Sequence, residues 1–278
     1  MPSAHANEMT IEYETFGSPT SPPVLLIMGL GGQLIAWDTA FCTALADAGF
    51  YVIRFDNRDV GLSTWLDDMA PDPPPYSLGD MADDAAGLLD ALRIPAAHVV
   101  GGSMGGMIAQ TFAIAHPERT LTLVSIMSTT GNRSVGQPTP EALAALMTPR
   151  PATREEAIEL GVKVAVVVGS PGYPANEQRQ RDLIAASFDR AFHPAGFARQ
   201  LAAINSQPDR TEALGTVRVP TLVIHGKADP LVTPSGGQAT ADAVQGARLK
   251  LVPGMGHNLP PELYGELVDD LAAHFRQI

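Results

Sequence analysis

The stretch His98-Val99-Val100-Gly101-Gly102-Ser103-Met104-Gly105-Gly106 indicates both the fold and the chemistry of this chain. It matches the pattern G-x-S-x-G, with an apolar, β-branched run before it and a helical pattern after it. Glycines beside a serine suit a sharp strand-to-helix turn, because Cβ atoms there would collide with the backbone. Such a turn exposes the hydroxyl at a helix N-terminus, where amide dipoles favour developing negative charge. We therefore predict that Ser103 is a catalytic nucleophile.

A serine nucleophile needs a general base, and the base needs an orienting carboxylate. His257 lies in the loop Gly254–Asn258, directly after the last predicted strand, and Asp229 follows the penultimate one. The other place for such an acid, Met127–Thr130, contains no carboxylate. We therefore predict that Asp229 and His257 complete the catalytic set with Ser103. The alternatives are a solvated loop histidine and a turn-forming aspartate before proline.

The predicted reaction also requires two backbone N–H groups that stabilise an oxyanion. Met104, the residue after the nucleophile, supplies one of them. The other is expected from the glycine-rich loop Gly29–Gly32, which follows a predicted strand. Leu30 is the preferred donor there, Gly31 is the second choice, and an ordinary turn is the structural alternative.

Short apolar runs alternate with helical patterns along most of the chain, which predicts an α/β fold with a mostly parallel, twisted sheet covered by helices on both faces. The expected strands are Met9–Phe16, Val24–Met28, Tyr51–Asp56, His98–Gly102, Leu121–Ile126, Thr221–His225 and Arg248–Val252. The expected helices are Leu34–Ala48, Ser77–Leu92, Ser103–Ala115, Ser235–Val244 and Pro261–Phe275. Ser77 and Asp80 are spaced as a capping box.

The alternation stops after Ile126. Residues 130–215 read as helices punctuated by prolines, and Val162–Val168 fits a helix better than a strand. We therefore predict an inserted helical cap over residues 130–215, and a core domain formed by residues 1–129 and 216–278. Acidic and basic residues are equal in number in the predicted cap, so the core carries the net charge.

The chain has 278 residues, a formal net charge of −12 and a single cysteine, Cys42. The negative charge argues against nucleic acid and anionic membranes as partners. One cysteine permits no internal disulfide and no paired-thiolate metal site. Neither a signal-peptide pattern in Met1–Phe16 nor a run of membrane-span length is present, which predicts a cytoplasmic location. No HExxH, Walker or complete GxGxxG motif occurs, so no metal or nucleotide cofactor is expected.

Taken together, these residues resemble the α/β-hydrolase superfamily, and within it the aclacinomycin methylesterase-type bacterial esterases. The likeness extends over essentially the whole chain, although the cap matches poorly and Met28 stands before Gly29 where His is more usual. The resemblance implies carboxylic-ester hydrolysis, the triad Ser103, Asp229 and His257, and Leu30 and Met104 as oxyanion donors. The stretches that carry it are Leu26–Gly29, Arg54–Thr64, His98–Gly105 and Pro253–Pro260.

The sequence is therefore interpreted as a serine esterase that acts through an acyl-enzyme on neutral, apolar or aromatic esters. The expected pocket residues are Trp37, Met28, Met127, Leu146 and Leu259, each with core packing as the alternative. The rival functions are a cofactor-free perhydrolase of haloperoxidase type, a C–C bond hydrolase, and a non-catalytic ligand receptor. A C–C hydrolase would need a cation to hold a substrate carboxylate, and Arg190 is the candidate, unless it is solvated or paired with an aspartate.

Overall fold

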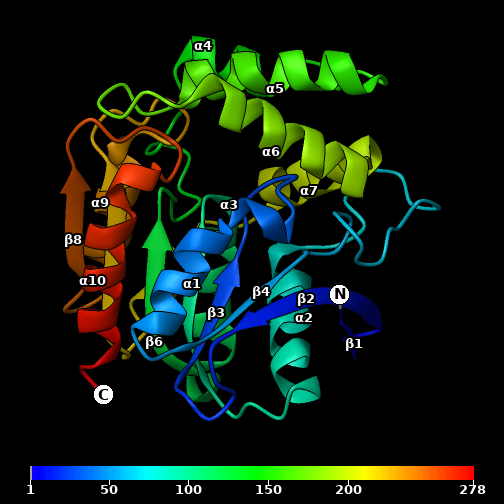
Figure 1. Cartoon of the computed structure of the whole chain (residues 1–278). Coiled ribbons are helices and arrows are strands. Elements are labelled where there is room, and N and C mark those ends of the chain that lie inside the picture. Colours follow the sequence, from blue (N-terminus) through cyan, green and yellow to red (C-terminus); the bar gives the residue numbers. More distant parts are fainter. Residues whose placement is uncertain (1) are drawn as a thin grey trace.

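The computed structural model describes residues 2–278 and has an eight-stranded sheet at its centre (Figure 1). The strand order is β1-β2-β4-β3-β5-β6-β7-β8. The strands are β1 (Ser3–Ala6), β2 (Met9–Phe16), β3 (Pro23–Ile27), β4 (Tyr51–Phe55), β5 (Ala97–Gly102), β6 (Thr120–Ile126), β7 (Thr221–Gly226) and β8 (Arg248–Val252). The sequence-based prediction located seven of these within about one residue at each end.

Six strands run parallel, and this orientation brings the functional loops together. β4, β3, β5, β6, β7 and β8 pair in parallel, whereas β1 and β2 pair with each other, and β2 with β4, in antiparallel fashion. The carboxyl ends of parallel strands lie at one edge of the sheet, so the loops after β3, β5, β7 and β8 meet there.

Strand β1 is not among the strands expected from the sequence, the first of which is Met9–Phe16. It forms a tight hairpin with β2 through Asn7 and Glu8, which both adopt positive φ angles. Four residues without an apolar pattern carry too little signal to predict an edge strand.

Helices cover both faces of the sheet (Figure 1). On one face, α1 (Thr39–Asp47) and α10 (Tyr264–Phe275) bury Phe41, Leu45 and Leu271. On the other, α2 (Leu78–Ala91) and α3 (Met104–Ala115) bury Leu88, Phe112 and their neighbours. Helix α9 (Pro234–Ala243) packs beside β7 and β8, and short 3-10 turns occupy Leu34–Ala36, Pro117–Arg119 and Pro261–Leu263.

Local capping explains where two of these helices begin. The side chain of Ser77 accepts from the Asp80 N–H, and the Asp80 carboxylate accepts from the Ser77 N–H, so the predicted capping box is confirmed. The helix expected over Leu34–Ala48 is instead a 3-10 turn followed by α1, because Asp38 caps a new helix through the Ala40 N–H.

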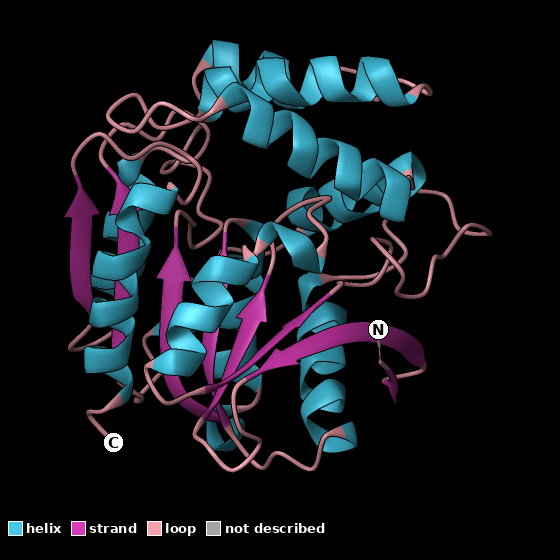
Figure 2. Cartoon of the chain, in the orientation of Figure 1, coloured by secondary structure: helices cyan, strands magenta, loops and turns pink. Residues whose placement is uncertain are grey.

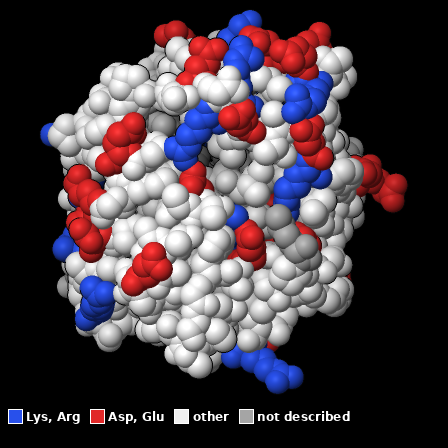
Figure 3. Space-filling view, in the orientation of Figure 1, with Lys and Arg blue, Asp and Glu red and all other residues white. Residues whose placement is uncertain are grey.

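The segment between β6 and β7 is helical and lies over the carboxyl edge of the sheet (Figure 2). Its helices are α4 (Pro140–Leu146), α5 (Arg154–Val168), α6 (Glu177–Arg190), α7 (Pro194–Ser206) and α8 (Thr211–Leu214). The helical interpretation of Val162–Val168 is confirmed, whereas the division into core and cap domains stays a prediction. Acidic and basic side chains are intermingled over this upper part of the face that Figure 3 shows. None of the helices described for residues 2–278 combines the length and apolar character needed to cross a membrane.

Candidate active site

Ser103 lies on the sharp turn between β5 and α3. Its φ of 56° and ψ of −122° are unusual for a residue with a side chain. A Cβ atom on Gly101 would lie 1.9 Å from the Gly105 carbonyl oxygen, and one on Gly105 would lie 2.0 Å from that of Ile27. Both glycines are therefore steric requirements of this turn, which holds the serine at the carboxyl edge of the sheet.

The three residues singled out from the sequence come together although they lie on three separate loops. His257 Nε2 lies 2.9 Å from Ser103 Oγ, and His257 Nδ1 lies 2.8 Å from Asp229 Oδ2. The backbone N–H of His257 also donates to the backbone carbonyl of Val168, at the end of α5, over 2.7 Å. The imidazole is thus oriented to accept the serine proton while the carboxylate holds its other nitrogen.

Asp229 is buried and stays ionised because several groups compensate its burial. Burial alone raises the pKa of this carboxyl, but the charge on His257 and hydrogen bonds from His225, His257 and the Val232 N–H lower it to about 2. Oδ1 accepts from the N–H groups of Leu231 and Val232, each over 2.9 Å. The carboxylate is therefore fixed and negatively charged.

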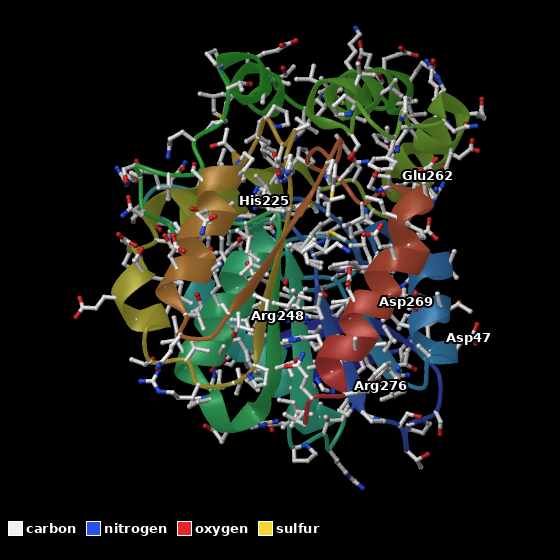
Figure 4. All side chains as sticks on the ribbon, turned by 90° about the vertical axis from the view of Figure 1, so that its left-hand side faces the viewer. Asp47, His225, Arg248, Glu262, Asp269 and Arg276 are labelled. Atoms are coloured by element: carbon white, nitrogen blue, oxygen red, sulfur yellow. The ribbon has the colours of Figure 1, made fainter. Side chains whose placement is uncertain are left out.

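His225, at the end of β7, is a further member of this cluster. Its Nε2 lies 2.7 Å from the Val232 carbonyl oxygen and 3.5 Å from Asp229 Oδ2. Figure 4 shows His225 near the cap end of the sheet, whereas Arg276 lies toward the opposite end. The spacing His225-x-x-x-Asp229 was visible in the sequence, but only the turn after β7 brings the two side chains together.

Two N–H groups near Ser103 are available for an oxyanion. Within residues 2–278, the N–H groups of Leu30 and Met104 have no hydrogen-bond acceptor, whereas the Gly31 N–H donates to Gln200 Oε1 over 2.8 Å. This difference favours Leu30 over Gly31 as the second donor. A Cβ atom on Gly29 would lie 3.0 Å from the Ser103 Cβ, so the loop passes close to the serine.

A cavity of about 710 Å³ opens beside Ser103 and His257, beneath the helices between β6 and β7. Of the predicted pocket residues, Met28, Met127 and Leu146 line it. Most of its other walls are apolar too, and Arg133 and Asn205 add polar groups. Its volume is within the range of ligand pockets for drug-sized molecules.

Trp37 and Leu259 do not line this cavity, in contrast to the sequence-based expectation. The Trp37 side chain is 1% exposed and stacks on Phe41, with ring centroids 5.8 Å apart, in the core beneath α1. Leu259 packs against the same core cluster. Both side chains therefore pack in or against the hydrophobic core on the sheet face that α1 and α10 cover, and they do not contribute to the cavity wall.

The charged side chains of the loop Asp56–Asp59 make structural ion pairs and hydrogen bonds. Arg58 makes a two-pronged ion pair with the buried Asp84, its Nε and one terminal nitrogen 2.6 and 2.7 Å from the two carboxylate oxygens. Asp56 accepts from the N–H groups of Leu34 and Leu62 and pairs with Arg190 over 2.7 Å. Arg190 is therefore paired with an aspartate, which was one of the alternatives expected from the sequence, and it does not line the cavity beside Ser103.

Comparisons with known proteins find matches over nearly the whole chain. The protein-family model described as alpha/beta hydrolase fold matches residues 22–262. A rhodomycin D methylesterase from Streptomyces sp. (strain C5) is 33% identical, with 97% of this chain and 96% of the relative covered. A second rhodomycin D methylesterase, from Streptomyces peucetius, is also 33% identical over the same shares of the two chains.

Among solved structures, the meta-cleavage product hydrolase from Pseudomonas fluorescens IP01 superposes with a TM-score of 0.77 and 23% identity. The match covers 100% of this chain and 98% of that one. At this identity the likeness supports the shared fold alone.

Proposed function

This chain belongs to the α/β-hydrolase fold family, and from that membership we propose a serine esterase mechanism centred on Ser103, His257 and Asp229. The chain is a carboxylic-ester hydrolase, like the methylesterases that match it over nearly their full length. The observation that carries the serine mechanism is the continuous contact from Asp229 through His257 to Ser103, with separations of 2.8 and 2.9 Å, at the wall of the 710 Å³ cavity.

In the proposed reaction, His257 takes the Ser103 proton as the oxygen attacks the ester carbonyl carbon. The carbonyl oxygen becomes an oxyanion, which the N–H groups of Leu30 and Met104 stabilise. The C–O bond to the alcohol then breaks, and the alcohol leaves with the proton from His257. Water, deprotonated by the same histidine, cleaves the acyl-enzyme, releases the acid and restores Ser103.

We further propose that the substrate is a neutral ester with an apolar or aromatic body. The cavity walls are mostly apolar, and the chain carries a net charge of −12 that repels anions at long range. The C–C hydrolase alternative needs a free cation to hold a substrate carboxylate. Arg190 is occupied by Asp56 and by Gln33, so it does not supply that cation. Arg133, which does line the cavity, donates to the Asn205 carbonyl oxygen over 3.2 Å.

The experiment that tests the mechanism combines a fluorophosphonate label with ester turnover. Ser103→Ala should abolish labelling and lower kcat by about 10⁴-fold or more, without loss of the fold. Ser206→Ala, at the exposed end of α7, is the matched control and should label and turn over as wild type does. Labelling that persists in Ser103→Ala would refute the assignment.

Dimethyl terephthalate and its monomethyl ester test the substrate class, because the two share a ring and differ by one free carboxylate. We expect a higher kcat/KM for the neutral diester. A preference for the monoester would contradict the proposal.

A further inference from the structure

A second cavity lies next to the one that contains Ser103. It has a volume of about 260 Å³ and is formed by α6 and α7 against the loops that follow β3 and β4. Among residues 2–278, Leu30 alone lines both cavities, and neither Ser103 nor His257 lines the second one. The second cavity is therefore a separate space that adjoins the proposed oxyanion loop.

Aromatic and apolar side chains form most of its walls. Phe188 and Phe192 stack with ring centroids 4.5 Å apart and an angle of 29° between the rings. Phe197 and Ile184 line the same space from α7 and α6. These surfaces offer flat contact to a small ring or a branched chain.

Arg150 brings a cation into this apolar space. Its side chain is half-buried, lines the cavity, and lies with its guanidinium carbon 4.1 Å from the centroid of the Phe197 ring. No residue among 2–278 accepts a hydrogen bond from Arg150 or forms an ion pair with it. Burial lowers the pKa of this guanidinium, with no carboxylate near enough to oppose the effect. A guanidinium stays charged in proteins, so Arg150 brings to the cavity lining a positive charge that is not neutralised by any residue among 2–278.

The other charged groups of the cavity already have partners. Asp59 is held by Arg199, whose Nε and one terminal nitrogen lie 2.8 Å from its two oxygens. His193 stacks on Trp65, with ring centroids 4.1 Å apart, and its Nε2 lies 2.9 Å from the Arg199 guanidinium. The charge on Arg150 is therefore the uncompensated one in this lining.

We propose that the second cavity binds a small organic carboxylate whose body is a single aromatic ring or a short branched chain. The carboxylate accepts two hydrogen bonds from the Arg150 guanidinium, a geometry that arginine favours. The body lies against Phe188 and Phe192, and the volume of about 260 Å³ accommodates a body of this size. The site requires no chemistry at Ser103, so it stands apart from ester hydrolysis.

Benzoate is the probe, titrated into the intact protein by calorimetry or by NMR. Arg150→Met should raise the Kd for benzoate by about tenfold to a hundredfold, as expected for loss of charge-assisted hydrogen bonds. Arg133→Met is the matched control, because Arg133 lines the larger cavity, and it should leave the Kd unchanged. Benzamide, which has the same ring and no charge, should bind at least tenfold more weakly than benzoate. Ser103→Ala should bind benzoate as wild type does.

Arg150→Met is expected to fold, because no hydrogen-bond or ion-pair partner among residues 2–278 would be left unsatisfied, and melting temperatures check this. Arg150→Lys keeps the charge without the planar fork and should show an intermediate Kd. An unchanged Kd in Arg150→Met, or equal binding of benzamide and benzoate, would overturn the proposal. A loss of binding in Arg133→Met alone would place the carboxylate in the larger cavity and overturn it as well.

Discussion

Replacing Gln200 tests whether the helices over the sheet position the proposed oxyanion loop. Gln200 lies on α7 and is fully buried. Its Oε1 accepts from the Gly31 N–H over 2.8 Å, and its Nε2 donates to the Arg58 carbonyl oxygen over 2.8 Å. Gln200→Met keeps the length of the side chain but removes both hydrogen bonds. Gly31 directly follows Leu30, so the loop that presents the Leu30 N–H loses its anchor.

The size of the effect follows from these two contacts. Each of the two buried groups left without a partner costs about 1–3 kcal/mol of stability, so we expect a total loss of about 2–6 kcal/mol. Removing an oxyanion donor outright costs about 10²–10³-fold in kcat. A displaced donor should cost less, so we expect kcat to fall by about 10–100-fold with little change in KM.

The assay separates positioning from stability. Steady-state kinetics on a neutral ester are measured beside urea unfolding for Gln200→Met and for Gln110→Met. Gln110 is equally buried and its amide is hydrogen-bonded to Ser125 and Arg210, but none of its hydrogen bonds goes to the Gly29–Gly32 loop. The control should lose stability and keep kcat. A wild-type kcat in Gln200→Met, or an equal loss of kcat in both variants, would refute the reasoning.

Three further changes give distinct outcomes. Asp229→Asn should reduce kcat less than His257→Ala does, because Asp229 orients the imidazole whereas His257 transfers the proton; equal activity of Asp229→Asn and wild type would show that another acid serves the site. Arg190→Met should destabilise the protein, because it leaves the buried Asp56 without its cation. The variant should still prefer dimethyl over monomethyl terephthalate. A selective loss of turnover of the monoester would favour the C–C hydrolase alternative. Burial, together with the charge of His274, lowers the pKa of His98 to about 4, so between pH 6.5 and 4 the unfolded chain binds a proton that the folded chain excludes. The free energy of unfolding should therefore fall by about 3 kcal/mol as the pH drops through this window. His98→Gln should lack this portion of the pH dependence in urea titrations, and an identical pH dependence in the two proteins would contradict the shifted pKa.

The positions of Ser103, Asp229 and His257 could be read from the sequence because each depends on local patterns. The glycines around Ser103 report backbone crowding within a single turn, and the apolar runs report strands buried on both faces. Parallel strands then bring the following loops to one edge of the sheet, whatever their separation in the chain. For the same reason Leu30 and Met104 could be nominated, since each directly follows a strand or the nucleophile.

Other features were decided by contacts between segments far apart in the chain, which no local pattern encodes. Trp37 and Leu259 looked like pocket residues, but the direction of their side chains depends on how α1 and α10 pack against the sheet. The partners of Arg190 and Gln200 come from loops that follow β3 and β4, so their roles appeared only when α6 and α7 had docked. The sequence by itself determined most of the strands and helices, and it determined which reactive side chains lie at the carboxyl edge of the sheet. Tertiary packing decided which polar groups of the cap are paired, and which cavities remain between cap and sheet.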